Sequence, residues 1–433
     1  MINLLNFNEE CCDNIEKEVV MTYPYIPRFI SVRVKKLFNA FPALVLTGAR
    51  QVGKSTLLKK IFPDIPCVVF DPVHDVQNAR QDPELFLKNH EPPIILDEIQ
   101  YAPELVPVIK RYIDKNRIPG RYILTGSQQW GVLNVIAESL AGRAAIVNME
   151  GFSFGEMAKM QPENLWLERW LSDPESFLTQ KQQRLNLPYT LYELLWRGSL
   201  PETFFLDRDI ISDYHYSYQK TYIEKDIRLL ADLSDLQLFG RFVKLVAALV
   251  AQEVNYSEIG RDIEVSPQTA RRWLSLLSQV FEWFEIPAFS NNSVKKVSLK
   301  PKGYFADCGQ ICFSQMISSK DAIASHPLAG AIFENAIVSE IRKQCMIMSS
   351  PPQMYHWREH QGAEVDLLLE RDGKFFPIEI KASTKPSKND IRGIKTFREK
   401  HAHLCVQKGL VIAPVNDVYG LSYDDIVIPF DIF

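Results

Sequence analysis

Several features that would indicate export, a membrane or a metal cluster are missing from this sequence. The longest apolar run, residues 245–251, is far shorter than the ~20 residues that span a bilayer. Glu9, Glu10 and Asp13 stand where a secretory signal would be basic. The seven cysteines form no Cys-x-x-Cys pair, and their number is odd. We therefore expect a cytoplasmic protein with reduced thiols and no membrane partner.

An excess of positive charge is also absent. The net charge is −4, and 46% hydrophobic with 24% charged residues is the composition of an ordinary globular protein. The surface as a whole therefore does not attract polyanions, and any nucleic-acid site must come from a local patch. At 433 residues the chain exceeds one hydrophobic core of about 250–300 residues, so we expect two to four domains.

The strongest motif that is present lies at residues 48–56, which match G-x-x-x-x-G-K-[ST]. An apolar run precedes it at 43–47 and a helix-like segment follows at 57–62, which is the setting that a phosphate-binding loop requires. The glycines let backbone N–H groups face a polyphosphate at a helix N-terminus. We predict ATP or GTP, with ATP preferred, and Mg²⁺ as cofactors. The predicted loop residues are Gly48, Ala49, Arg50, Gln51, Val52, Gly53, Lys54, Ser55 and Thr56.

Residues 93–98 read as an apolar strand that ends in two acids. Asp97 is expected to hold Mg²⁺ together with Ser55, and Glu98 to orient or deprotonate the attacking water. After the next apolar run, Thr125 and Ser127 are candidate sensors of the γ-phosphate, or residues that merely cap a strand.

Arg143 is a candidate arginine that would stabilise transition-state charge on a phosphate, across a subunit interface of a homo-oligomer. The alternative is an ordinary surface arginine.

The order of apolar runs indicates the domain organisation. Short runs at 43–47, 67–70, 94–96, 122–125 and 145–149 alternate with helix-length segments, which predicts βαβ units and a parallel sheet. We divide the chain into an extension without assigned chemistry (1–24), an ATPase core (25–155), a helical lid or connector (156–235), a winged helix–turn–helix (236–305) and an α/β domain (320–433).

The helix–turn–helix pattern covers helices at 256–263 and 269–281, with Ser266 as N-cap of the second helix and a wing strand at 295–299. Charges between 253 and 302 nearly balance, so the module could bind DNA or serve only as a packing domain. The side chains that would face a DNA groove are Gln268, Arg271 and Arg272.

A second candidate site lies in the C-terminal segment. Residues 364–369 and 375–381 read as a hairpin that turns at 371–374. Glu379 and Lys381 share one face of their strand, and Asp366 can meet them from the partner strand. With Glu334 from the preceding helix, these residues could hold Mg²⁺ for phosphodiester hydrolysis, with Lys381 catalytic. The alternative is a hairpin with a surface salt bridge.

A basic stretch follows this hairpin. Residues 381–400 carry seven basic side chains against two acidic ones, which suits a phosphate backbone or a solvated helix face. The predicted DNA contacts here are Lys385, Lys388 and Arg392.

Taken together, these motifs resemble those of a prokaryotic family in which an AAA-type ATPase domain is joined to a winged helix and a PD-(D/E)XK nuclease-like domain. The matching residues are 48–56, 96–100, 125–127, 142–143, 364–366, 379–381 and Glu334, within a likeness that covers about 25–425. The resemblance implies an α/β fold class. It comprises a P-loop AAA-type parallel sheet core, a helical lid plus winged helix–turn–helix, and a C-terminal restriction-endonuclease-like α/β domain. One departure is Val365, where the family pattern has proline before the metal-binding acid.

The leading hypothesis is an Mg²⁺-dependent ATPase that couples ATP hydrolysis to a DNA-acting nuclease-like domain, in DNA processing or defence against mobile DNA. The alternative is a nucleotide-switched regulator whose C-terminal domain docks on DNA or protein without cleaving.

Overall fold

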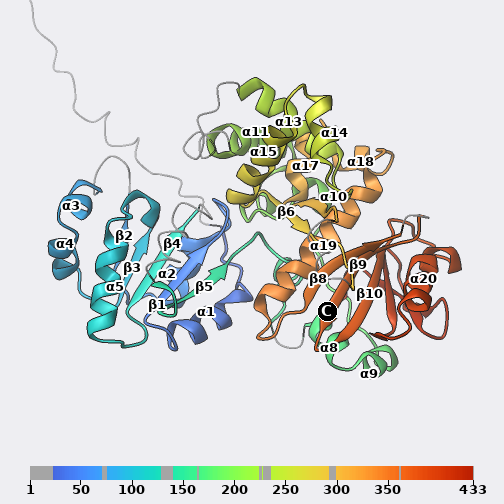
Figure 1. The fold of residues 1–433 in the computed structure, drawn as a ribbon, viewed down its shortest axis with the longest axis horizontal. Coiled ribbons are helices and arrows are strands. Elements are labelled where there is room, and N and C mark those ends of the chain that lie inside the picture. Colours follow the sequence, from blue (N-terminus) through green and yellow to red (C-terminus); the bar gives the residue numbers. More distant parts are fainter. Residues whose placement is uncertain are drawn as a thin grey trace, which may run out of the picture.

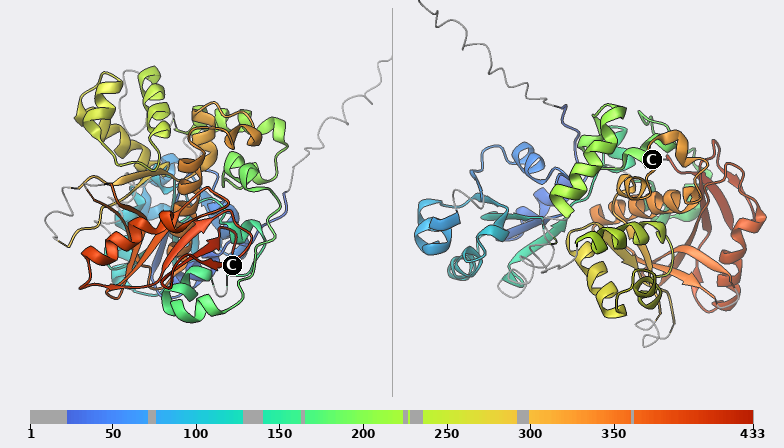
Figure 2. Two further views of the ribbon diagram at one scale, coloured as in Figure 1. Left: turned by 90° about the vertical axis from the view of Figure 1, so that its right-hand side faces the viewer. Right: turned by 90° about the horizontal axis from the view of Figure 1, so that it is seen from above.

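The computed structural model describes residues 23–70, 76–127, 140–162, 165–223, 227, 236–291, 299–359 and 362–432. Two sheets lie at opposite ends of the long axis, and a helical region lies between and above them (Figure 1). The view from above keeps the same order, with the N-terminal sheet at one end and the C-terminal sheet at the other (Figure 2). None of the helices in these ranges is long and apolar enough to cross a membrane.

The N-terminal sheet has the order β2-β3-β4-β1-β5, and every pair in it is parallel. Alternate side chains enter different cores, with Leu44 and Leu46 on one face of β1 and Val45 on the other, so both faces are covered. The parallel sheet predicted from the five apolar runs is confirmed, with ends shifted by a residue or two. Its strands are β1 (Ala43–Thr47), β2 (Cys67–Val69), β3 (Ile94–Asp97), β4 (Tyr122–Gly126) and β5 (Ala144–Asn148).

In the described part of the chain, the helices that accompany this sheet are α1 (Ile30–Phe38), α2 (Lys54–Ile61), α3 (Val76–Gln81), α4 (Pro83–Asn89) and α5 (Leu105–Lys115). Because β4 lies between β1 and β3, the carboxyl ends of these three strands are neighbours. This order brings the phosphate-binding loop, the Asp97–Glu98 pair and the hydroxyls after β4 to one edge.

The segment predicted as a lid, 156–235, does not act as one unit. It contains α7 (Phe154–Met157), α8 (Trp166–Ser172), α9 (Pro174–Thr179), α10 (Leu191–Arg197), α11 (Ile211–Tyr218) and the π-helix η5 (Gln219–Ile223). The α8–α9 part packs on the C-terminal sheet, where the Trp170 and Phe376 ring centroids are 5.3 Å apart. Arg371 pairs with Glu168 at 2.8 Å. Helices α8 and α9 thus belong to the packing around the C-terminal sheet, and the assignment of 156–235 as a helical lid or connector stays a prediction.

The helix–turn–helix consists of α14 (Tyr256–Asp262) and α15 (Pro267–Gln279), after α13 (Leu236–Ala248). The Ser266 side chain accepts a hydrogen bond from the Thr269 amide at 3.1 Å, as an N-cap does. Strand β6 (Trp283–Ile286) then pairs antiparallel with β7 (Lys302–Phe305). The predicted wing strand falls mainly on 295–298, outside the described residues, and its last residue, Leu299, is not in a strand. The winged-helix assignment stays a prediction.

The C-terminal sheet has the order β13-β14-β12-β10-β9-β8, with β11 beside β10. Asp372 (φ 54°) and Gly373 (φ 74°) form the two-residue turn of the predicted hairpin, as Asp-Gly turns do in tightly connected strands. The strands are β8 (Gln353–Arg358), β9 (Glu364–Arg371), β10 (Lys374–Ile380), β11 (Cys405–Val406), β12 (Gly409–Ala413), β13 (Tyr419–Gly420) and β14 (Asp425–Pro429). Helices α19 (Ala329–Ile347) and α20 (Arg392–Lys400) pack against this sheet, whereas α17 (Cys308–Ser314) and α18 (Lys320–Ile323) pack against α10 in the helical region.

The long helix α19 joins these parts. Its Glu340 carboxylate accepts from the Phe154 amide at 2.9 Å, and its Lys343 ammonium donates to the Phe152 carbonyl at 3.0 Å. Asn335 bonds both backbone groups of Phe305 in β7. One hydrophobic core accordingly runs from the N-terminal sheet through the helical region to the C-terminal sheet.

Candidate functional site

The phosphate-binding loop connects β1 directly to α2. Gly48 has φ +150°, and a Cβ atom added there would lie 2.0 Å from the Met149 carbonyl oxygen, so only glycine fits. Gly53 (φ 94°) and Gln51 (φ 60°) are also left-handed; for Gln51, which is not glycine, this is the kind of backbone strain found at functional sites. The buried Lys54 ammonium donates to the carbonyls of Gly48 at 2.9 Å and Ala49 at 2.8 Å.

Two oxygen ligands suited to Mg²⁺ meet beside the loop. The Ser55 hydroxyl donates to Oδ2 of Asp97 at 2.6 Å. Thr125 donates from its hydroxyl to Oδ1 of the same carboxylate. Hydroxyl and carboxylate oxygens are the ligands that Mg²⁺ prefers, so Ser55 and Asp97 fit the predicted ion.

Glu98 lies one residue beyond the strand, in a left-handed conformation with φ 59°. Its carboxylate accepts from the Ser127 hydroxyl at 3.3 Å and from the Gln100 amide. Thr125 also accepts from the Glu98 backbone N–H at 3.1 Å. The two acids and the two predicted sensor hydroxyls thus form one hydrogen-bonded group. The role of Gln100 was not predicted, although it belongs to the same short motif.

A cavity of about 890 Å³ opens over this loop, within the usual range for small-molecule sites. Its far wall comes from two segments that were not predicted to contribute. The Tyr23 and Phe205 rings stack there with centroids 4.8 Å apart and planes 8° from parallel. Among the residues lining the cavity are Tyr23, Arg28, Phe152, Pro201, Glu202 and Phe205, together with residues 50–56 and Glu98. Aromatic walls beside a phosphate loop are suited to a nucleotide base and ribose.

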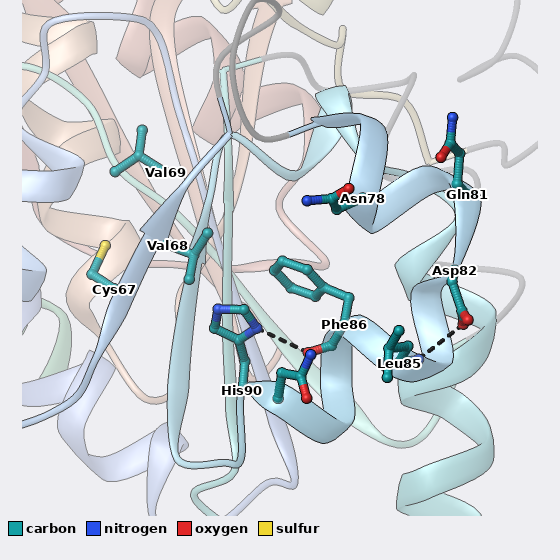
Figure 3. A pocket seen from close by; sticks show the side chains of 10 residues that line it. Cys67, Val68, Val69, Asn78, Gln81, Asp82, Leu85, Phe86 and His90 are labelled. Atoms are coloured by element: carbon teal, nitrogen blue, oxygen red, sulfur yellow. Dashed lines mark hydrogen bonds between the residues drawn. The ribbon is translucent and has the colours of Figure 1, made fainter.

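A second cavity, of about 770 Å³, lies beside β2 at the outer edge of the N-terminal sheet (Figure 3). Phe86 and His90 line it, and His90 Nδ1 lies 2.9 Å from the Phe86 carbonyl oxygen. The predicted site residues all belong to the described part of the chain, and none of them lines this cavity.

Arg143 lies at the wrong end of the strands to contact the nucleotide of its own chain. Its carbonyl accepts from the Ala43 amide at the start of β1, whereas the phosphate loop follows the end of β1. Five residues of strand separate the two ends by roughly 15 Å. The guanidinium pairs with Asp114 on α5, and this hydrogen bond lowers the pKa of the Asp114 carboxyl. Two of the predictions for Arg143 remain, that it acts on a neighbouring subunit and that it is an ordinary surface arginine.

The C-terminal hairpin brings its predicted residues together. The β9–β10 register pairs Ile378 with Leu367, which sets Asp366 opposite Glu379. The Lys381 ammonium lies 2.9 Å from Oε2 of Glu379 and 3.3 Å from Oδ2 of Asp366. We call Glu334, Asp366, Glu379, Lys381 and Lys302 the carboxylate cluster.

Lys302, from β7, completes this cluster and was not predicted. Its ammonium lies 3.0 Å from Oε1 of Glu334 and 3.4 Å from Oδ1 of Asp366, and only 4% of its side chain is exposed. Burial opposes ionisation of Asp366, but the two neighbouring ammonium groups hold its pKa below the ordinary value. Burial and the charge of Asp366 raise the pKa of Glu379. Burial likewise raises the pKa of Glu334.

This arrangement does not fit a divalent metal. At Asp97 the partners are hydroxyls, but both oxygens of Asp366 contact ammonium groups, Oδ1 that of Lys302 and Oδ2 that of Lys381, and Oδ2 also accepts from the Ile380 amide at 2.9 Å. Within the described ranges, no group of three or more His, Cys, Asp or Glu residues is placed to hold a metal ion. The predicted ligands Glu334, Asp366 and Glu379 are bridged by lysines instead.

The predicted DNA contacts all lie on the surface. Lys385, Lys388 and Arg392 are exposed, and a Cβ atom on Gly393 would lie 2.7 Å from Oε1 of Glu379, so the start of α20 abuts the cluster. On α15, the exposed residues are Gln268, Arg271 and Arg272. The Arg271 guanidinium lies 5.9 Å from the centre of the Tyr256 ring.

Comparison with known proteins supports the first of these sites. Residues 40–158 match the sequence profile of an AAA domain. This segment is similar to AAA-type P-loop domains. Residues 189–321 and 329–433 match two domains of unknown function, DUF8612 and DUF4143.

Two mycobacterial proteins are similar to this chain over most of their length. Uncharacterized protein Rv2008c of Mycobacterium tuberculosis and uncharacterized protein Mb2031c of Mycobacterium bovis are each 26% identical to this chain over 405 residues. The match covers 93% of this chain and 83% of each relative.

Similar solved structures include the Walker-type ATPase paby2304 of Pyrococcus abyssi, with 16% identity over 66% of this chain and 94% of that chain, at a TM-score of 0.37. RuvB of Thermotoga maritima has 13% identity over 62% and 92% of the two chains, at a TM-score of 0.28.

Proposed function

We propose that the chain is an Mg²⁺-dependent ATPase whose nucleotide state acts on its C-terminal domain. The observation that carries the hydrolytic part is the hydrogen-bonded group of Ser55, Asp97, Thr125, Glu98 and Ser127 beside the phosphate loop. A loop that only bound nucleotide would not need a second acid held by hydroxyls at its edge.

Each side chain has a distinct task in this mechanism. Lys54 exchanges its two loop carbonyls for phosphate oxygens when ATP enters. Ser55 and Asp97 would hold Mg²⁺, which would neutralise charge on the bound phosphates. Glu98, oriented by Ser127, positions the attacking water and accepts its proton. Charge that develops on the γ-phosphate is stabilised by the loop N–H groups, since they are fixed before the reaction.

The structure also suggests how the loop acts on other parts of the chain. Tyr214 of α11 donates a hydrogen bond to the Gln51 side chain at 2.7 Å. Arg28 donates to the Val52 carbonyl at 2.7 Å and to the Glu150 carbonyl at 2.6 Å. The Glu150 carboxylate pairs in turn with Arg342 of α19. Movement of the loop on binding ATP would therefore be transmitted through these contacts to the helical region and to α19.

ATP binding and turnover can be separated by two variants. Lys54→Ala should abolish ATP binding, because Lys54 contacts the phosphates in the ground state. Glu98→Gln should bind ATP normally but lower kcat by about 10²–10⁴, the usual contribution of a general base. Calorimetry of ATP binding and a phosphate-release assay measure the two effects. Lys59→Ala removes an exposed lysine from the same helix and should change neither. A normal rate for Glu98→Gln would contradict the assignment of Glu98.

For the C-terminal domain, docking on DNA without cleavage is the second candidate function. It is favoured over cleavage by the lysine-bridged cluster and by the exposed Lys388 and Arg392 beside it. Reversing both charges (Lys388→Glu with Arg392→Glu) should weaken binding of duplex DNA and reduce its dependence on salt. Lys374→Glu, an exposed change at the hairpin turn, is the control. Equal DNA binding by both variants would exclude this face, and Mg²⁺-dependent strand cleavage by the wild type would favour the nuclease.

A further inference from the structure

We propose that Lys302 is an internal cation that occupies the carboxylate cluster in place of a divalent metal, so that the wild-type cluster takes up no metal ion. The proposal concerns the C-terminal cluster alone. It would stand even if the phosphate loop did not hydrolyse ATP.

The first observation is where Lys302 comes from. Lys302 is the first residue of β7. This strand pairs with β6, which follows the helix–turn–helix in sequence, and it does not pair with the C-terminal sheet. Side chains two apart on a strand point the same way, and Tyr304 accordingly donates its hydroxyl to Glu334 at 2.8 Å. Two polar side chains from one strand therefore reach the same carboxylate on α19.

The second observation is burial. An ammonium group removed from water is costly unless carboxylates surround it. Lys302 has two carboxylate partners, Glu334 and Asp366, which approach from a helix and from a strand. Both carboxylates lie within 3.4 Å of one point, the ammonium nitrogen, so the cluster already binds a cation there.

The third observation is charge balance. The cluster holds three carboxyl groups and two ammonium groups, and these contact one another directly. The Lys381 ammonium pairs with Glu379 and Asp366 on one side of the cluster. The Lys302 ammonium pairs with Asp366 and Glu334 on the other side. Glu364, a further carboxylate near Lys302, is paired with the exposed Arg358 at 3.8 Å, so a divalent ion added to the cluster would give an excess of positive charge. Removal of Lys302 reverses the situation, because Glu334 then loses its ammonium partner in the cluster, Asp366 keeps only Lys381, and both carboxylates face the vacated position.

The chain segment that carries Lys302 is tied to the helix–turn–helix. The Val254 amide donates to the Pro301 carbonyl at 2.7 Å, and the Gly303 amide donates to the Gln252 carbonyl at 3.0 Å, just before α14. The internal cation thus belongs structurally to a different part of the chain from the acids that it neutralises.

Titration of the full-length, nucleotide-free protein with Mn²⁺, followed by electron paramagnetic resonance of the free ion, tests this proposal. Wild type and Asp366→Asn should bind Mn²⁺ alike, with no Asp366-dependent site up to millimolar concentration. Lys302→Met should gain one site at least tenfold tighter than any in the wild type, and Asp366→Asn in that background should remove it. Lys300→Met, which changes an exposed lysine two residues earlier, should behave as wild type.

Stability provides a second readout. Mn²⁺ should raise the melting temperature of Lys302→Met more than that of the wild type, since only in the variant do the carboxylates of the cluster lack the Lys302 ammonium. If Lys302→Met does not fold, Lys302→Gln retains a polar side chain and takes its place. Asp366-dependent Mn²⁺ binding by the wild type would overturn the proposal. So would folded Lys302 variants that take up no Mn²⁺. ATP turnover enters neither readout, so failure here is distinguishable from failure of the ATPase assignment.

Discussion

Replacement of Glu282 by glutamine should stabilise the protein, and increasingly so as pH rises. Glu282 lies between α15 and β6 and is 2% exposed. The Tyr218 hydroxyl donates to its Oε1 at 2.9 Å, whereas Oε2 has no hydrogen-bond partner among the described residues. Burial raises the pKa of Glu282 to about 8. The carboxyl group is therefore protonated in the folded protein at neutral pH.

The magnitude follows from the difference between folded and unfolded pKa. The unfolded group titrates near 4.5 and the folded group near 8. Between these values the unfolded chain releases a proton that the folded protein keeps, so the free energy of unfolding falls as pH rises. At 1.36 kcal/mol per pH unit, the loss amounts to about 5 kcal/mol at most by pH 8, and it is constant above. Glutamine does not titrate, so the free energy of unfolding of the Glu282→Gln variant does not show this decrease.

Urea unfolding followed by tryptophan fluorescence at pH 5, 6, 7, 8 and 9 measures the effect. The stability difference between Glu282→Gln and wild type should be small at pH 5, grow to a few kcal/mol at pH 8 and then level off. Glu399→Gln, an exposed change on α20, should track the wild type at every pH. Parallel stability curves for Glu282→Gln and wild type would refute a protonated Glu282.

Two further predictions concern the phosphate loop. Gly48→Ala should weaken ATP binding by at least about tenfold in calorimetry, because its Cβ would overlap the Met149 carbonyl oxygen, whereas Gly330→Ala, on a helix with open space around it, should bind normally. Arg143→Ala should lower kcat far more than ATP affinity, and mixing it with Lys54→Ala should restore phosphate release if the arginine acts on a neighbouring subunit; no recovery in an exchanging oligomer would exclude that role.

The parts of the fold that the sequence predicts are those with local signals. The phosphate loop is a contiguous motif, and each strand of the N-terminal sheet is a short apolar run, so both can be read within a few residues. The Asp372-Gly373 turn fixed the register that sets Asp366 opposite Glu379. At each of these places, residues close together in the sequence were enough to predict the local structure.

What the sequence could not show depends on contacts between distant segments. The aromatic residues of α8 predict a buried face, but not that its partner is Phe376, about 200 residues away. Arg143 directly precedes a predicted parallel strand, so its place at the opposite edge from the phosphate loop could have been inferred, but its pairing with Asp114 on α5 could not. Lys302 lies 64 residues from Asp366, and nothing near it in sequence marks it as a partner for buried acids.

The position of α19 sets a physical requirement for coupling between the two candidate sites. Phe152 lines the nucleotide cavity, and its carbonyl accepts a hydrogen bond from Lys343. Glu334 of the same helix enters the carboxylate cluster nine residues earlier, roughly 14 Å along the axis at 1.5 Å per residue. Since a helix moves as a stiff element over this length, displacement of the Phe152 segment would carry Glu334 with it as long as the Lys343 bond is kept. Asn335 of α19 also bonds Phe305 of β7, so Lys302 would move with Glu334, and the contacts of these two residues with Asp366 are the ones that such a movement would strain.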